Sequence, residues 1–281
     1  MRANRFQILG MSKEVLIQVF CLSVAMTCIF PIFWMIRSAL MTNETVFVDK
    51  GLIPQEIVWT NFATAWTKGN FGAYFLNSLI YTSAVVAGIV IISSLAAFSF
   101  SRLSFPGKNA IFYLFVAAMM IPLPGSFVAL FVLMNKLHLI NTRFGYILCM
   151  INVGLSMSIL LLKTFFDKMP KDLEDAARID GCGKIGIWWH VALPLARPAI
   201  AVIVIFNSLN VWNEYILANL LLTNKDLMPL QRGVMEFQGA NSVDYPVLMA
   251  GLTMAAVPII MVYLSMQKHI VKGLSSGAVV G

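Results

Sequence analysis

The chain has 281 residues, of which 59% are hydrophobic and 12% are charged. A soluble fold of this size could not cover so much apolar surface with so few charged side chains, so we expect most of the chain to lie in lipid. The net charge of +7 does not indicate a nucleic-acid partner, because the basic residues are scattered and no base-stacking aromatic platform surrounds them. A basic excess in a membrane protein is typical of cytoplasmic loops that face anionic lipid.

Apolar stretches long enough to cross a bilayer as helices, about 20 residues each, occur six times. They cover residues 14–38, 75–100, 109–134, 143–166, 196–222 and 246–267. The first stretch is too long for the apolar core of a signal peptide, so we expect a retained helix. Pro122 and Pro124 interrupt the third, which favours a kink or, alternatively, backbone groups satisfied inside a wet cavity. The predicted fold class is all-α: one polytopic membrane domain over residues 1–281 with six transmembrane helices.

The positive charges between the spans predict the orientation. With six spans, the termini and the even-numbered loops share one side, which carries 13 Lys and Arg against 7 on the other side. The positive-inside rule therefore places both termini in the cytoplasm. The connections 39–74 and 223–245 then face outward, and 167–195, between the fourth and fifth spans, is the large cytoplasmic loop.

The cytoplasmic loop begins with a predicted helix over residues 169–181. Pro170 suits the first turn, acidic residues follow at the positive end of the helix dipole, and Gly181 supplies a left-handed stop. Glu174 and Arg178 are spaced for an i,i+4 ion pair. On the same helix, we expect one face to carry Leu173, Ala176 and Ala177, where the small side chains would let a partner's backbone come close.

A second amphipathic helix is predicted after the Gly-Cys-Gly break. Ile185, Trp188, Trp189 and Ala192 fall at i, i+3, i+4 and i+7, so they share a face. The two helices together either dock another protein or lie on the membrane surface against lipid and their own bundle.

The predicted span 196–222 carries polar residues on one face. Asn207, Asn210 and Glu214 are spaced by three and four residues. Such residues either hydrogen-bond between helices or line a hydrophilic path for a substrate. The candidate substrate-path residues are Asn207, Asn210, Asn213 and Glu214.

The sequence contains no grouping of cysteines, histidines or glycines that is typical of an active site or a nucleotide site. The four cysteines lack metal-ligand spacing, and the three histidines are isolated. A phosphate-cradling loop is missing, because Arg102 and Arg178 occupy the position of the first glycine before the two Gly-Lys pairs. We therefore expect no catalytic residue, no metal ligand and no cofactor in this chain.

The spacing within the cytoplasmic loop is similar to a known signature. Asp175-Ala-Ala-Arg-Ile-Asp-Gly181, nine residues and Val191-Ala-Leu-Pro194 resemble the EAA motif of binding-protein-dependent ABC importer permeases, with Asp175 for Glu and Val191 for Ile. Three further segments resemble the carbohydrate branch of these permeases, of the maltose-transporter type: Leu139-Ile-Asn-Thr142, Trp212-Asn-Glu-Tyr215 and 273–281.

This resemblance implies the transmembrane permease subunit of an ATP-driven importer for sugars or oligosaccharides in the bacterial inner membrane, a transport subunit rather than an enzyme. The implied partners are a second homologous permease, an ATPase dimer that holds ATP and Mg, and an extracytoplasmic solute-binding protein. The candidate ATPase-coupling residues are Glu174, Asp175, Ala176, Ala177, Asp180, Gly181, Leu193 and Pro194. The alternatives are a permease for another solute, such as a sugar phosphate or polyol, a membrane-embedded enzyme and a membrane assembly factor.

Two further segments have expected roles. The tail 273–281 is either a disordered end or, as in the maltose-type permeases, an insertion between the ATPase subunits. The outward loop 223–245 carries apolar residues that either fold back onto the bundle or contact another protein. In related permeases this loop resembles a scoop that reaches into the binding protein. The candidate contacts are Gln238, Gly239, Ala240 and Asn241, in a turn-like stretch.

Shortening residues 236–242 to a two-residue turn tests the loop. If the loop contacts the binding protein, sugar uptake is lost while the complex still assembles in the membrane. Binding-protein-stimulated ATPase activity and uptake are the two quantities to measure. Full uptake by the shortened variant would make the loop a passive connector.

Overall fold

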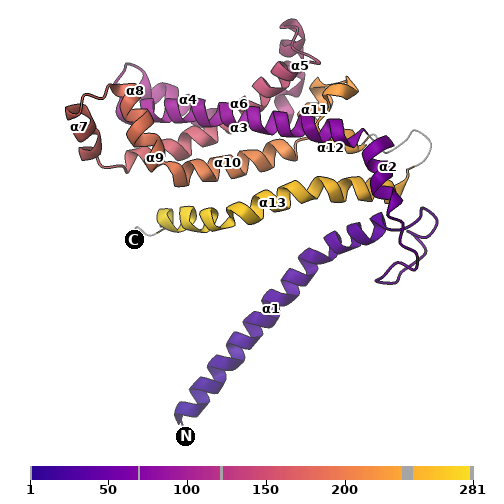
Figure 1. Cartoon of the computed structure of the whole chain (residues 1–281). Coiled ribbons are helices and arrows are strands. Elements are labelled where there is room, and N and C mark those ends of the chain that lie inside the picture. The colour runs from indigo at the N-terminus through magenta and orange to yellow at the C-terminus, as the bar shows by residue number, and fades with distance from the viewer. Residues whose placement is uncertain (1, 69, 121–122, 236–242, 279–281) are drawn as a thin grey trace. The chain divides into compact units, whose positions relative to one another are not determined.

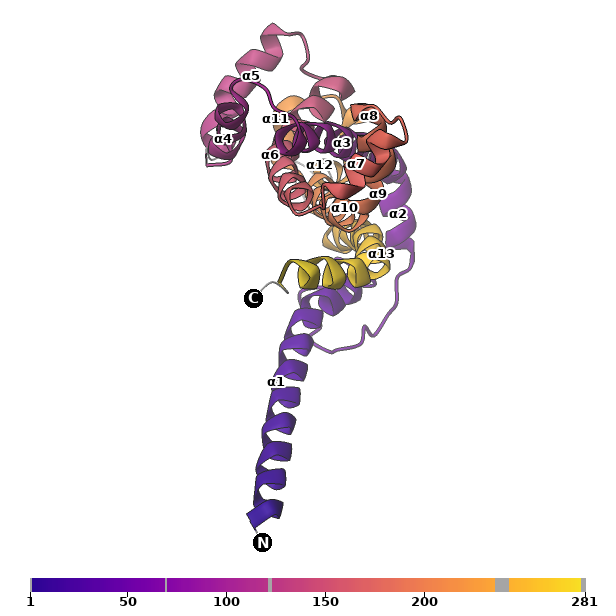
Figure 2. The ribbon, with the colours of Figure 1, turned by 90° about the vertical axis from the view of Figure 1, so that its left-hand side faces the viewer.

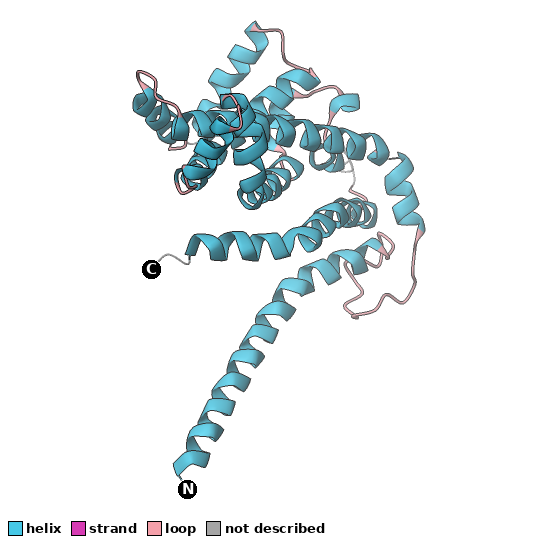
Figure 3. Ribbon diagram, turned by 60° about the vertical axis from the view of Figure 1, so that its left-hand side comes forward, coloured by secondary structure: helices cyan, strands magenta, loops and turns pink. Residues whose placement is uncertain are grey.

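The computed structural model describes residues 2–68, 70–120, 123–235 and 243–278, with side chains except at 2–13, 68, 123–124 and 266–278. The regular structure of this part of the chain consists of helices joined by loops (Figure 3). Two compact units result, one from residues 1–70 with 236–256 and the other from 71–235 with 257–281. The prediction of a single domain over 1–281 stays a prediction.

The first unit contains α1 (Arg2–Ala39), α2 (Thr60–Lys68) and the beginning of α13 (Tyr245–Ala278). Its small core consists of Ala39, Ala65, Val247 and Ala250, against which Phe62, Met249 and Met254 pack. The amide of Asn61 donates to the carbonyls of Ala39 and Met41, at 2.9 and 2.8 Å, and so satisfies backbone groups where α1 ends.

A buried arginine fixes the connection after α1. The Arg37 guanidinium lies 4.7 Å from the centre of the Trp34 ring and 3.3 Å from the Asp49 carboxylate. It also donates to the Asp49 carbonyl at 3.0 Å. Because Arg37 is only 2% exposed, these contacts hold the connection against the end of the helix.

The second unit is built on three helices that lie side by side: α3 (Phe71–Arg102), α6 (Arg143–Asp167) and α10 (Arg197–Trp212) (Figures 1 and 2). Small residues let them come close. A Cβ on Gly154 of α6 would overlap the side chains of Ile89 in α3 and Asn207 in α10. The three helices therefore meet at this glycine.

Shorter elements surround these three helices. They are α4 (Lys108–Ala118), the 3-10 turn η1 (Leu123–Ser126), α5 (Phe127–Lys136), α7 (Asp172–Ile179), α8 (Lys184–Ile187), the π-turn η2 (Trp188–Ala192), α9 (Leu193–Leu195), α11 (Ile216–Leu221), the 3-10 turn η3 (Lys225–Leu227) and α12 (Leu230–Val234). Contacts at the two ends of α3 place α7 near its last turn and α12 near its first turns (Figure 1).

Four helical segments of the described chain are long and apolar enough to cross a membrane: Glu14–Ala39, Phe71–Arg102, Arg143–Asp167 and Tyr245–Ser265. They overlap the predicted first, second, fourth and sixth spans. A fifth crossing results if Lys184–Leu195 and Arg197–Trp212, bent by 76°, count as one span. The all-helical membrane fold is thus confirmed at this coarser level.

The other two predicted spans are not continuous helices. In 109–134, α4 ends at Ala118 and α5 begins at Phe127, because the Pro-rich stretch between them lacks the backbone donors that a helix needs. In 196–222, α10 ends at Trp212 and α11 begins at Ile216. The prediction of an interrupted third span is confirmed, whereas the continuous fifth span was wrong.

Gly154→Ala should destabilise the second unit by about 1–3 kcal/mol, because its Cβ has no room where α3, α6 and α10 meet. Gly186→Ala is the matched control, since its Cβ would meet only Cys182 at ordinary contact distances of 3.5 and 3.8 Å. Thermal midpoints of the detergent-solubilised variants provide the measurement. Equal midpoints for the two variants would contradict the packing described here.

Candidate functional site

The segment after α6 contains the predicted helix, observed as α7 over Asp172–Ile179. Gly181 has a φ of +86°, as the predicted left-handed stop requires. The Gly181 N–H donates to the Arg178 carbonyl at 3.0 Å, and the Cys182 N–H donates to the Ala177 carbonyl at 2.9 Å. These two bonds form a Schellman motif, which ends the helix at a defined residue.

The faces of α7 differ from the prediction. Its two buried residues are Glu174 and Ala177, and the other residues are exposed. The expected shared face is therefore wrong, since Leu173 and Ala176 are exposed while Ala177 packs into the core. The reason is that Glu174 takes the inward position, where it finds a partner on another helix.

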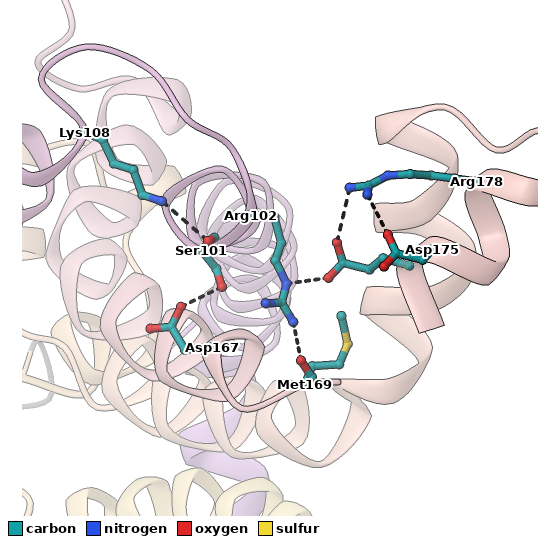
Figure 4. A network of polar contacts seen from close by, with 8 residues as sticks. Ser101, Arg102, Lys108, Asp167, Met169, Asp175 and Arg178 are labelled. Carbon is teal, nitrogen blue, oxygen red and sulfur yellow. Dashed lines mark hydrogen bonds and ion pairs between the residues drawn. The ribbon is translucent and has the colours of Figure 1, made fainter. Parts of the chain in front are cut away.

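That partner is Arg102, the last residue of α3 (Figure 4). Its Nε is ion-paired with the Glu174 carboxylate, and its Nη2 donates to the Met169 carbonyl at 2.6 Å. The side chains of Arg102 and Glu174 are 7% and 5% exposed. One guanidinium therefore holds both the first turn of α7 and the chain just before it.

Arg178 joins this network from the exposed side. Its Nη1 lies 2.8 Å from the Asp175 carboxylate, whereas its Nη2 lies 3.9 Å from the second oxygen of Glu174. The predicted Glu174–Arg178 pair is present at the edge of ion-pair distance. Asp175 is the closer partner because it lies on the same exposed face as Arg178.

The ends of α3 and α6 are also joined by polar contacts (Figure 4). The Ser101 hydroxyl donates to the Asp167 carboxylate at 2.6 Å. Lys108 Nζ donates to the carbonyls of Leu103 and Ser101 at 3.0 and 3.4 Å. The end of α3 is thus joined by polar side chains to the end of α6 and to the start of α4.

The second predicted amphipathic helix contains a π-turn. Trp188 and Ala192 are buried, but Ile185 and Trp189 are 76% and 58% exposed, so the predicted common face was wrong. The π-turn over Trp188–Ala192 changes the number of residues per turn and so rotates the side chains away from a 3.6-residue period. Among the coupling candidates, Leu193 is half-buried and Pro194 is exposed.

The polar residues of α10 have separate environments. Asn207 is buried, and its Nδ2 donates to the Ile203 carbonyl at 2.9 Å and to the Ser158 hydroxyl at 3.3 Å. Asn210 and Asn213 are exposed, and the Asn213 amide donates to the Leu209 carbonyl at 2.8 Å. Interhelical hydrogen bonding therefore accounts for Asn207.

Glu214 lies in the break between α10 and α11. Its carboxylate accepts the backbone N–H groups of Leu217 and Ala218, at 2.5 and 2.9 Å, and the Tyr146 hydroxyl at 3.1 Å. A new helix start needs acceptors for its first N–H groups, and water is scarce in a membrane. Glu214 meets that need, so the sequence Trp212-Asn-Glu-Tyr215 begins a helix as well as interrupting one.

Asn141 holds the chain that follows α11. At φ +56°, its side chain donates to the Thr223 hydroxyl at 2.6 Å and accepts the N–H groups of Thr223 and Asn224 at 2.6 and 3.0 Å. Its own N–H donates to the Leu221 carbonyl at 2.9 Å. The motif Leu139-Ile-Asn-Thr142 therefore joins the start of α6 to the end of α11.

The first part of the loop 223–245, predicted to face outward, folds onto α3. The Asn77 amide donates to the carbonyls of Asp226 and Met228, at 2.8 and 3.1 Å, and the Tyr81 hydroxyl donates to the Leu227 carbonyl at 2.7 Å. Met228 and Leu230 are buried, which agrees with the alternative that the apolar residues fold back. Gln238, Gly239, Ala240 and Asn241 lie outside the described residues.

Comparison with known proteins decides the family. Residues 88–276 match the family described as "Binding-protein-dependent transport system inner membrane component". The chain belongs to this family. It is a permease, a transport subunit rather than an enzyme, and the resemblance based on residues 175–194 is confirmed.

Two relatives and one solved structure illustrate the similarity. The diacetylchitobiose uptake system permease protein of Streptomyces coelicolor is 32% identical over 89% of this chain and 83% of its own length. The trehalose/maltose transport system permease protein of Thermococcus litoralis is 30% identical over 96% of this chain and 98% of its own length. A chain of a bacterial ABC transporter involved in the import of alginate, an acidic polysaccharide, has the same fold, with a TM-score of 0.80 and 24% identity over 93% of this permease and 96% of that chain.

The described residues of the permease contain no group of three or more His, Cys, Asp or Glu that could hold a metal ion. Sequence reasoning missed Arg102 as a site residue. The one available signal was a basic residue at the end of an apolar span, which the positive-inside rule explains equally well.

Glu214→Ala should lower the free energy of unfolding by about 1–3 kcal/mol, because two N–H groups at the start of α11 lose their acceptor. Asn213→Ala is the control, since Asn213 is exposed and bonds only within its own helix. Thermal midpoints and the KM for the transported solute separate the two roles proposed for Glu214. An unchanged midpoint with a raised KM would favour the substrate path over the capping role.

Proposed function

We propose that this permease imports sugars or oligosaccharides, with an ATPase dimer docked on α7. Membership of the binding-protein-dependent family, together with a largely exposed α7 that is followed by the left-handed Gly181, carries the proposal. The named substrates of the two curated relatives, diacetylchitobiose and trehalose or maltose, support a saccharide. A sugar phosphate or a polyol is the alternative solute.

The proposed membrane arrangement has six crossings, of which the third and the fifth are broken helices, and both termini lie in the bacterial cytoplasm. The unequal loop charges, 13 against 7, support this orientation. So does the position of α7 and residues 226–230 at opposite ends of α3, which agrees with a cytoplasmic and an outward loop.

The proposed docking surface comprises Asp175, Ala176, Asp180 and Gly181, all of which are exposed. The two remaining candidates on this helix, Glu174 and Ala177, are buried and hold α7 to its own bundle instead. A polar rim around one small side chain suits a partner whose backbone approaches closely. The Asp175 carboxylate, already beside Arg178, is available to a basic side chain of the ATPase.

Movement would reach the spans through the chain that follows α7. Leu193 and Pro194 lie in α9, directly before the 76° bend into α10. When the ATPase subunits close on ATP and Mg, which they hold themselves, α7 to α9 would shift and α10 would rock with them. This is alternating access by rigid-body rotation.

The remaining partners follow from the same proposal. A solute-binding protein delivers the sugar to the outer face, and a second homologous permease completes the path. Glu14–Ala39 is long and apolar enough to cross a membrane, and its coverage by lipid and by that second permease is part of the proposal. The tail is helical to Ala278, and its insertion between the ATPase subunits is part of the proposal.

Gly181→Val should uncouple ATP hydrolysis from uptake, because a β-branched residue strongly disfavours a φ of +86° and would distort the end of α7. Gly183→Val is the matched control: both sites have open space around an added Cβ, but Gly183 has a φ of −74°. Uptake and ATPase activity are measured in vesicles that contain the assembled transporter. Normal uptake by Gly181→Val at normal assembly would contradict docking through α7.

A further inference from the structure

The helix α7 is held to the rest of the second unit by few buried atoms. Of its eight residues, Glu174 and Ala177 are the buried ones. Beside them lies a hollow of about 260 Å³, bordered by Phe98 and Leu103 of the α3 side and by Arg178 and Lys184. Because one methyl group buries little apolar surface, hydrophobic packing alone would position α7 weakly.

The buried ion pair supplies the missing connection. Arg102 reaches two points of the cytoplasmic segment, the Glu174 carboxylate within α7 and the Met169 carbonyl before it. A planar guanidinium that is bonded at two points fixes the orientation of its partners as well as attracting them. Both charged side chains are more than nine-tenths buried, so loss of either one leaves the other as an uncompensated charge.

The ion pair also connects α7 directly to a spanning helix. Arg102 is the last residue of α3, a continuous helix of 32 residues. Near the opposite end of that helix, Asn77, Ser78 and Tyr81 bond the outward segment 226–230. A displacement of α7 can therefore reach α3 without passing through the bend between α9 and α10.

We infer that Arg102 is a positioning residue for coupling, which passes the displacement of α7 to α3 through its ion pair with Glu174. This inference rests on the proposed function, because it takes α7 to be where the ATPase acts. The role inferred for Arg102 requires no contact with nucleotide or sugar. Its role is to make α7 and α3 move as one body.

The experiment uses the complete transporter, with its ATPase and binding protein, in lipid vesicles. Arg102→Gln and Glu174→Gln should each lower the amount of sugar imported per ATP hydrolysed by about tenfold, a typical coupling magnitude. The double variant Arg102→Glu with Glu174→Arg restores opposite charges and should recover most of that ratio. Lys163→Gln is the control, because its pair with Asp167 is exposed and should matter by less than about twofold.

The ratio of uptake to hydrolysis separates positioning from a general loss of stability, which would lower both quantities together. If a single variant does not assemble, the charge-reversed double variant still tests the inference. A wild-type ratio in the assembled double variant supports the inference, and a ratio as low as in an uncoupled transporter overturns it.

Failure of the inference is distinguishable from failure of the proposed function. If Gly181→Val uncouples the transporter while Arg102→Gln and Glu174→Gln keep the wild-type ratio, the ion pair is not the route, although α7 still is. If Gly181→Val and both single variants all keep the wild-type ratio, the docking proposal fails and the inference fails with it.

Discussion

A charge at the buried end of an apolar helix needs a partner, and in this permease that requirement joins α3 to α7. Arg102 ends α3 in the place where the positive-inside rule expects a basic residue, but its side chain turns inward to Glu174. The acidic residue thereby faces the bundle, and the neighbouring Asp175, Ala176 and Asp180 are left exposed. The exposed residues of α7, which form the proposed docking surface, thus lie opposite the ion pair that holds the helix.

Buried polar groups also need partners at the opposite end of the second unit, and this need explains the polar residues in the segments 139–142 and 212–215. Broken helices in a membrane expose backbone donors, which require acceptors within the protein. Glu214 supplies them at the start of α11, and Asn141 supplies them for the chain that follows. Two of the three segments that resemble maltose-type permeases, 139–142 and 212–215, therefore have structural roles in this fold that do not depend on contact with sugar.

The sequence predicted local features well where one residue determines the outcome. Gly181 permits the left-handed backbone that follows α7, Pro-rich sequence interrupts a span, and a long apolar run forms a helix. Prediction from the sequence failed where a side chain's contacts depend on residues far apart in the chain. The partner of Glu174 lies in another helix, so the nearer Arg178 was the only pairing that helical spacing could indicate. The π-turn at Trp188 likewise breaks the period on which the predicted face relied.

We infer that α7 and α3 move together when the ATPase subunits act. Spin labels at Ser104, after α3, and at Ile179, in α7, report on it directly, since both positions are exposed. They would be placed in an assembled transporter whose four native cysteines in this chain are replaced by serine. We predict that the distance between the labels stays constant to within about 2 Å between the nucleotide-free and ATP-bound states. A change of about 5 Å or more, the rise of one helical turn, would contradict the account.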